Sequence, residues 1–140
     1  MLKIGCHLSV TKGYLHMAQT AVKLGGNTFQ FFSRNPRGGK AKALDIDDVK
    51  AMLTYMAAHN FAPILAHATY TLNPGSVETA KRDFAHLVFT EDLERMEHMP
   101  GNLYNFHPGS FGASDLDTAT QEVIKILNDV LSAKLNTTVL

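Results

Sequence analysis

Short apolar runs alternate with longer amphipathic segments along all 140 residues of the chain. Aromatic and β-branched residues in the runs are typical of buried strands, which we predict at 2–6, 27–32, 63–66 and 103–106. Apolar residues at helical spacing predict helices at 11–24, from Asp45, at 76–99 and at 114–130. Strands that alternate with helices indicate an α/β protein with a parallel sheet and right-handed crossovers.

The β-branched and apolar residues 137–140 predict the start of a fifth strand. Four βα units and this stub amount to half of an eight-unit barrel, which usually has about 250 residues. An open, doubly wound sheet is the alternative. No linker divides the chain, so we expect residues 1–140 to form a single domain, a partial (β/α)8 TIM barrel that is part of a larger fold.

Composition excludes some classes of function. The chain has 13 basic and 13 acidic residues, so its net charge gives no support to nucleic-acid binding by bulk charge. A single cysteine, Cys6, cannot form an internal disulfide, and we expect a buried, reduced thiol. No apolar run approaches the roughly 20 residues that cross a bilayer. We therefore expect a soluble, cytoplasmic protein without membrane contact.

Histidines stand where the predicted strands end. His67 follows the apolar run 63–66, and His107 follows 103–106. The carboxyl ends of barrel strands form the active site, so these imidazoles should point into one space. Imidazole is a common zinc ligand, although a catalytic zinc usually has three protein ligands. His7, after the first strand, is either a third ligand or a hydrogen-bonding residue in the floor of the site.

The loop 33–42 follows the second strand and carries four cationic residues and no acid. It is either a solvated basic loop or, beside the histidines, a contact for phosphate oxygens. Tyr70 is either a core residue or an exposed ring that stacks on a base. Asp45 and Asp48 are spaced to cap a helix. In the helix 76–99 we expect four apolar residues to form the inner face: Ala80, Phe84, Leu87 and Val88. We expect five charged residues of this helix to lie in solvent: Glu91, Asp92, Glu94, Arg95 and Glu97.

Taken together, four stretches resemble the amino-terminal half of endonuclease IV: residues 1–9, 29–37, 64–73 and 105–110, in order and at that family's spacing. The resemblance implies a (β/α)8 barrel with three zinc ions that hydrolyses the DNA phosphodiester 5′ to an abasic site and leaves a 3′-hydroxyl. His67 and His107 match two histidines that hold one zinc. Asn35, Arg37 and Tyr70 match positions of the family's DNA-recognition loops.

The family's remaining zinc ligands would follow residue 140, and its catalytic residues are therefore unknown here. We expect little or no nuclease activity from the 140 residues alone. The first and fifth strands would leave two open sheet edges, which predicts self-association or partial disorder near 137–140. Two alternatives stay open: a sugar isomerase or epimerase of the xylose-isomerase-like barrels, and a module that binds DNA or a partner without cutting.

Overall fold

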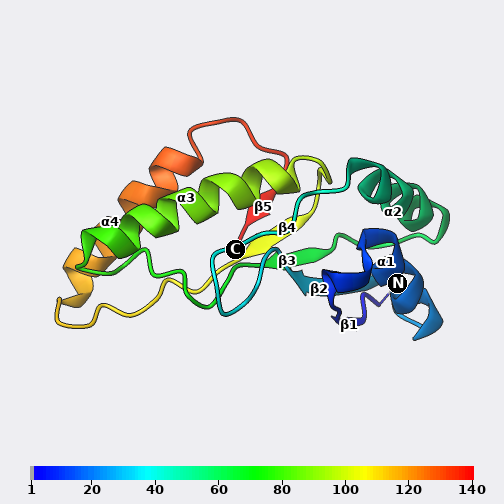
Figure 1. Cartoon of the computed structure of the whole chain (residues 1–140), viewed down its shortest axis with the longest axis horizontal. Coiled ribbons are helices and arrows are strands. Elements are labelled where there is room, and N and C mark those ends of the chain that lie inside the picture. The colour runs from blue at the N-terminus through cyan, green and yellow to red at the C-terminus, as the bar shows by residue number, and fades with distance from the viewer. Residues whose placement is uncertain (1) are drawn as a thin grey trace.

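The computed structural model describes residues 2–140; Met1, the first residue of the matched stretch 1–9, lies outside them. Five parallel strands form one sheet, and their order in the sheet is their order in the chain (Figure 1). A doubly wound sheet would reverse direction at a switch point, so this order confirms the arc of a barrel. The strands are β1 (Gly5–His7), β2 (Thr28–Phe32), β3 (Leu65–His67), β4 (Leu103–Asn105) and β5 (Thr138–Val139).

Helices connect consecutive strands, and α1 packs beside α2 while α3 packs beside α4 (Figure 1). Their bounds are η1 (Val10–Lys12, a 3₁₀ turn), α1 (Tyr14–Lys23), α2 (Ile46–Ala58), α3 (Thr79–Met96) and α4 (Leu116–Val130). The helix predicted at 11–24 is divided because Gly13 has a positive φ of 104°, which α-helical backbone does not allow. The helix predicted from Ser76 begins three residues later, at Thr79.

Acidic side chains fix where three helices begin. Asp45 caps α2 by accepting the N–H groups of Asp47 and Asp48, each at 3.1 Å. Asp115 caps α4 through Thr118 N at 2.8 Å. Asp48, expected in the cap of α2, instead accepts the N–H groups of Tyr14 at 2.5 Å and Leu15 at 3.2 Å, at the start of α1. A side chain from one helix therefore satisfies the free donors of its neighbour.

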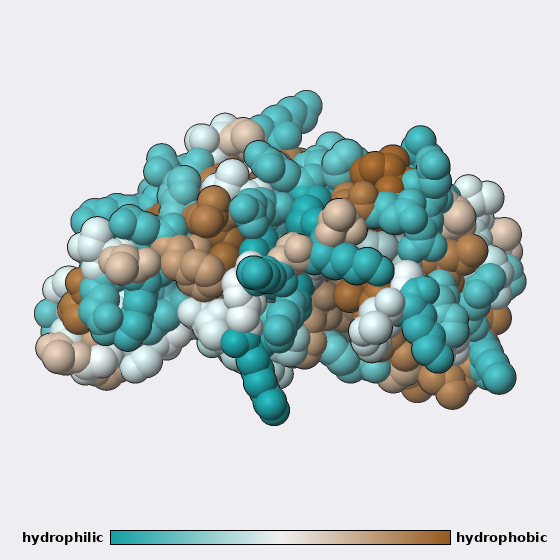
Figure 2. Space-filling model, in the orientation of Figure 1, coloured by the Kyte–Doolittle hydropathy of each residue, from teal (hydrophilic) through white to brown (hydrophobic). Residues whose placement is uncertain are grey.

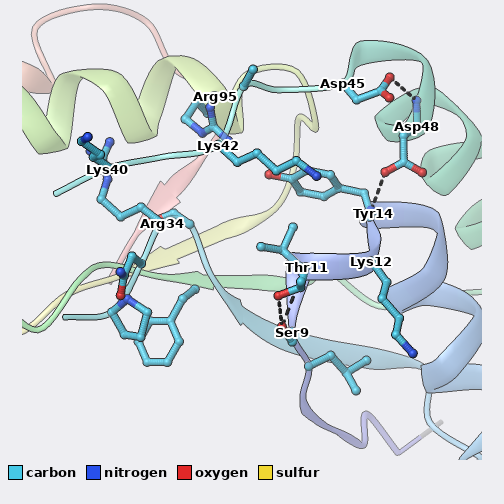
Figure 3. Close-up of a pocket in the computed structure, with 18 of the residues that line it drawn as sticks. Ser9, Thr11, Lys12, Tyr14, Arg34, Lys40, Lys42, Asp45, Asp48 and Arg95 are labelled. Carbon is cyan, nitrogen blue, oxygen red and sulfur yellow. Dashed lines mark hydrogen bonds between the residues drawn. The ribbon is translucent and has the colours of Figure 1, made fainter. Parts of the chain in front are cut away.

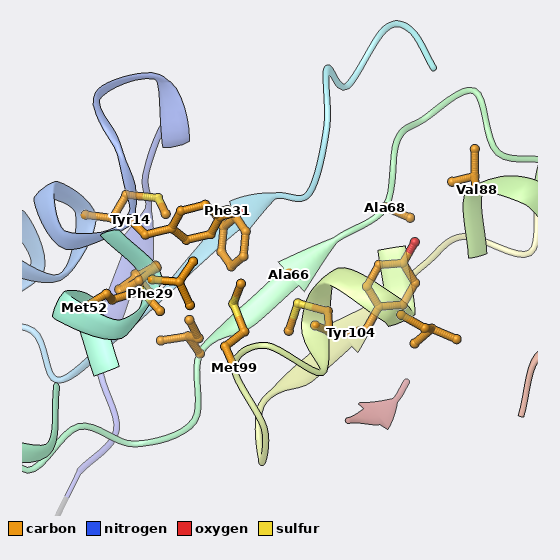
Figure 4. Packing of buried hydrophobic residues seen from close by; sticks show 14 of the residues in the cluster. Tyr14, Phe29, Phe31, Met52, Ala66, Ala68, Val88, Met99 and Tyr104 are labelled. Carbon is orange, nitrogen blue, oxygen red and sulfur yellow. The ribbon is translucent and has the colours of Figure 1, made fainter. Parts of the chain in front are cut away.

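The two faces of the sheet have different surroundings. Phe29 and Phe31 of β2 are buried, as are Ala66 of β3 and Tyr104 of β4, and they pack against helical residues such as Met52 and Val88 (Figure 4). Alternate residues along a strand point to opposite faces. Gln30 and Phe32 accordingly lie on the other face, where they are half-buried. This second face carries the histidines.

The inner face predicted for α3 is wrong in part. Leu87 is 54% exposed and Ala80 is exposed, whereas Val88 is buried as predicted and Asp92, predicted to be solvated, has an exposed fraction of 0%. Apolar residues are spread almost evenly around this helix, so the sequence pattern alone selects no face. Tertiary contacts decide the orientation, and they turn these residues inward: Ala85, Val88, Phe89, Asp92, Leu93 and Met96.

Strand β1 forms one edge of the sheet, and all three of its residues are exposed. The expectation of a buried thiol is therefore wrong: Cys6 is exposed because no strand among residues 2–140 covers that edge. Leu2 and Ile4 beside β1 and Leu140 beside β5 are exposed as well. On the face shown in Figure 2, hydrophobic patches lie between hydrophilic ones. No helix within residues 2–140 has the length and apolarity to cross a bilayer.

Residues 137–140 confirm the predicted fifth strand. Thr138 and Val139 pair with Leu103 and Tyr104 of β4. Just before them, the Glu97 carboxylate accepts the backbone N–H groups of Asn136 and Thr137 at 3.0 Å. This segment therefore forms a strand rather than a disordered end, and self-association stays a prediction.

Candidate metal and DNA-binding site

Strand register brings the strand-end histidines together. Phe32 pairs with His67, and His67 pairs with Asn105. Paired residues share a face, and His107 lies two residues after Asn105, which returns it to that face. The ring centroids of His67 and His107 are 5.0 Å apart. The prediction of two imidazoles in one space at the carboxyl end of the sheet agrees with this geometry.

The environment of His67 selects its tautomer. This side chain is 6% exposed, and its Nδ1 lies 2.7 Å from the carbonyl oxygen of Ala68. A carbonyl oxygen only accepts, so Nδ1 carries a proton, and in the neutral ring Nε2 keeps its lone pair. A histidine whose second nitrogen donates to a carbonyl is the usual form in metal sites. His67 therefore fits a zinc ligand through Nε2, and the exposed His107 lies beside it.

Aromatic rings surround the two imidazoles. Tyr70 is 62% exposed, which excludes the core alternative, and its ring stacks on that of His107 at 6.0 Å with an interplanar angle of 24°. The ring centroid of Phe32 lies 5.2 Å from those of His67 and Tyr70, and 4.7 Å from that of His7. No sequence motif singles out Phe32. Its signal was position alone, because it is the last residue of β2, next to the strand that delivers His67.

His7 lies one ring further along this face. Its Nδ1 is 3.1 Å from the amide nitrogen of Gln30, which can only donate. Partial desolvation lowers the pKa of His7, and the nearby His67 lowers it further, so both effects favour the neutral form of the ring. The proton of this neutral ring is then on Nε2. This arrangement favours the hydrogen-bonding alternative for His7 over direct ligation.

The loop after β2 presents Asn35 and Arg37 to solvent. Asn35 closes its own turn, since its Oδ1 accepts the N–H of Arg37 at 3.0 Å. The carbonyl oxygen of Pro36 accepts the Thr69 hydroxyl and the Tyr70 N–H, both at 3.0 Å. These bonds join the loop that carries Arg37 to the loop that carries Tyr70. The structure thus brings Asn35, Arg37 and Tyr70 together along one rim.

Arg34 does not belong to that rim. The loop was expected to offer four cations, but Arg34 is 4% exposed and donates through Nε and Nη2 to Asp92 at 3.0 and 2.7 Å. Ser33 and Tyr104 also donate to Asp92, at 2.6 and 2.8 Å. Burial acts to lower the pKa of Arg34, but the hydrogen bonds to Asp92 and the negative charge of Asp92 raise it above its ordinary value. Arg34 therefore anchors the loop and is not available to phosphate.

The loop after β4 is held to the loop after β3 by Asn73. Its side chain donates to the carbonyl oxygen of Ser110 at 3.2 Å and accepts the Ser110 N–H at 3.1 Å. Gly109 has a positive φ of 87°, and a Cβ there would collide with the Asn73 amide. Only glycine fits this close approach. The loop that follows His107 therefore keeps a fixed position beside the one that follows His67.

Within residues 2–140 no group of three or more His, Cys, Asp or Glu side chains comes together in a way that could hold a metal ion. His67 and His107 are two ligands, and the donor set of an ordinary catalytic zinc is larger.

Comparison with known proteins identifies the family. A family model described as xylose isomerase-like TIM barrel matches residues 18–139. The chain belongs to this family. It is also 51% identical, over all 140 residues, to a protein of Alkaliphilus oremlandii named probable endonuclease 4. That match covers 50% of the relative, so the chain spans about half the length of the curated relatives it matches.

Two solved structures place the fold more closely. Endonuclease IV from Thermus thermophilus superposes with a TM-score of 0.77 at 24% identity, over 97% of this chain and 51% of that one. D-psicose 3-epimerase from Clostridium cellulolyticum superposes with a TM-score of 0.63 at 10% identity, over 92% of this chain and 48% of that one. These structures support the partial barrel. The resemblance to endonuclease IV is confirmed by the sequence match, whereas the epimerase shares the fold alone.

Proposed function

We propose that this chain supplies one part of a zinc-dependent endonuclease that cuts DNA 5′ to abasic sites. The observation that carries the proposal is the pair of imidazoles from β3 and β4, with centroids 5.0 Å apart, beside an exposed tyrosine. His67 and His107 would hold one zinc ion. Zinc bound there would supply a hydroxide near neutral pH and stabilise negative charge on the phosphate.

The chain's own residues bind and orient the DNA in this proposal. Arg37 and Asn35 offer exposed donors to phosphate oxygens, and Tyr70 offers a ring for stacking beside the abasic nucleotide. That nucleotide has no base to unstack, which lowers the cost of moving it out of the duplex. Asp92, through Arg34, keeps the loop after β2 beside Tyr70.

Zinc titration of the 140-residue chain by calorimetry tests the metal site. We expect zinc binding that is lost, or weakened at least about tenfold, in both His67→Ala and His107→Ala. Exposed histidines that follow the ends of α2 and α3 provide matched controls, and His59→Ala and His98→Ala should bind zinc as the wild type does. Circular dichroism verifies folding. Unchanged zinc binding in both strand-end variants would contradict the proposal.

A second candidate is a module that binds abasic DNA without cutting it, and the absence of a third ligand within residues 2–140 favours it for the chain alone. We expect salt-sensitive binding to a duplex with an abasic analogue, weakened by Arg37→Ala, together with little or no incision. If the 140-residue chain cuts abasic DNA robustly and a chelator stops the cutting, the expectation of little or no activity is refuted. Retention of manganese or magnesium rather than zinc would instead support a sugar isomerase or epimerase.

We also propose self-association through the two sheet edges. Leu2 and Ile4 flank β1 and are 76% and 55% exposed, and Leu140 flanks β5 and is 55% exposed. Unpaired edges with apolar neighbours favour pairing with another chain. Sedimentation should show species larger than a monomer at micromolar concentration, and Ile4→Lys should reduce them. A monomer throughout would disprove this arrangement.

A further inference from the structure

A cleft of about 810 Å³ (Figure 3) opens beside Phe32, which contacts His67, although neither His67 nor His107 lines it. Its walls are the loop after β1, the loop after β2 with the stretch that leads to α2, and the side chain of Arg95 from α3. His7, Phe32 and Asn35 form the end nearest the imidazoles. The volume lies within the usual range of small-molecule sites.

Positive charge dominates this cleft. Lys12, Lys40, Lys42 and Arg95 line it, and none of them has an ion-pair partner within the part of the chain that the structure describes. The two lining acids are engaged elsewhere, because Asp45 and Asp48 accept the free N–H groups at the starts of α2 and α1. Helix N-termini carry partial positive charge, so they offset these carboxylates. An anion entering the cleft therefore meets a net attraction.

Arg95 has an unused donor. Its Nε is buried and has no hydrogen-bond partner among residues 2–140. A buried donor without a partner is destabilising, because it has lost its hydrogen bonds to water. The guanidinium lies next to the hydroxyl of Tyr14, and Lys42 lines the same cleft. A guanidinium presents paired N–H groups that match two oxygens of a phosphate.

We infer that the cleft is a phosphate-binding site in which Arg95 donates to two phosphate oxygens and Lys42 supplies a second positive charge. If the bound phosphate is part of DNA, the inference rests on the proposed function. A strand that passes the imidazoles would continue past Asn35 into this cleft, so the bound group would be a backbone phosphate outside the abasic nucleotide. Inorganic phosphate or a mononucleotide has the same chemistry and would occupy the same groups.

Two binding measurements on the 140-residue chain separate these sources. In one, fluorescence anisotropy follows a labelled duplex, either undamaged or with an abasic analogue; in the other, calorimetry follows inorganic phosphate and thymidine 5′-monophosphate. Arg95→Met keeps the apolar stem and should weaken binding at least about tenfold, as expected for loss of hydrogen bonds to a charged group. Lys42→Ala should weaken it about threefold or more, while the exposed Lys23→Ala on α1 should match the wild type.

If the two variants lose affinity only for the DNA probes, the site binds a backbone phosphate. If they lose affinity for the small ligands, the site binds free phosphate. Wild-type affinity in both Arg95→Met and Lys42→Ala overturns the inference, as does an absence of binding to every probe by the wild type. Circular dichroism checks both variants, and the exposed Lys42 tests the site independently of the partly buried Arg95. Zinc binding by His67 and His107 is a separate measurement, so the metal proposal and the phosphate proposal fail separately.

Discussion

Two segments that are far apart in the chain, the loop after β2 and the approach to β5, are each anchored by a carboxylate, the first from α3 and the second from the residue that follows α3. Asp92 is fully buried and accepts from Ser33, Arg34 and Tyr104. Glu97, five residues later, lies at the surface and accepts from the backbone and side chains of Asn136 and Thr137. The same kind of group thus performs the same task in two very different surroundings.

The difference shows how burial changes the consequence of losing an anchor. Removal of one partner from a buried ion pair leaves the other charge in a medium that solvates it poorly. Arg34 would be left in this state, with only its bonds to the Gly39 carbonyl oxygen and to Glu91. Water replaces lost hydrogen bonds at the surface, so the loss of Glu97 leaves no uncompensated charge. The buried anchor should therefore contribute more to stability than the surface anchor.

The largest expected effect is that of Asp92→Ala, which should lower the free energy of unfolding by about 3–5 kcal/mol. The loop that carries Asn35 and Arg37 loses its anchor in this variant, so binding to abasic duplex should weaken as well. Urea unfolding measures the first effect and fluorescence anisotropy the second.

Glu91→Ala is the matched control, because Glu91 also contacts Arg34, at 3.1 Å, but its side chain is 47% exposed. Exposed pairs contribute about 0–1 kcal/mol. Equal losses for Asp92→Ala and Glu91→Ala would show that burial does not set the strength of the anchor.

A smaller effect is expected for Glu97→Gln, about 1 kcal/mol at neutral pH. Burial acts to raise the pKa of Glu97, but hydrogen bonds from Asn136 and Thr137 lower it below its ordinary value of 4.5. A carboxyl group with a lowered pKa stabilises the folded state above its unfolded pKa, and this contribution is lost as the pH falls through the folded pKa. The difference in stability between wild type and Glu97→Gln should therefore shrink below about pH 4.5.

Hydrogen exchange at the amides of 136–139, with urea unfolding across this pH range, measures the effect. Glu94→Gln lies on the same helix in an exposed position and should show no such difference. A stability difference for Glu97→Gln that stays constant from pH 7 to pH 3 would mean that the carboxylate charge is not what holds β5.

The sequence was sufficient for the parts of the site that depend on strand ends. His67 and His107 each follow an apolar run, and parallel strands place their carboxyl ends together, so local pattern and sheet chirality determine their approach. Asp92 shows where this reasoning fails. Its helix has no clear apolar face, so only packing against Ser33, Arg34 and Tyr104 turns it inward. The same contacts remove Arg34 from the cations that the loop offers to solvent.

The amino-acid sequence by itself determined three features: the alternation of strands and helices, the strand-end histidines and the resemblance to endonuclease IV. These features depend only on side-chain period and on order along the chain. The tertiary structure alone decided which polar groups meet across the fold: the Asp92 anchor, the Asp48 cap on a neighbouring helix and the cationic cleft around Arg95. These contacts join residues far apart in sequence. Their formation depends on the three-dimensional packing of whole elements, which local patterns do not encode.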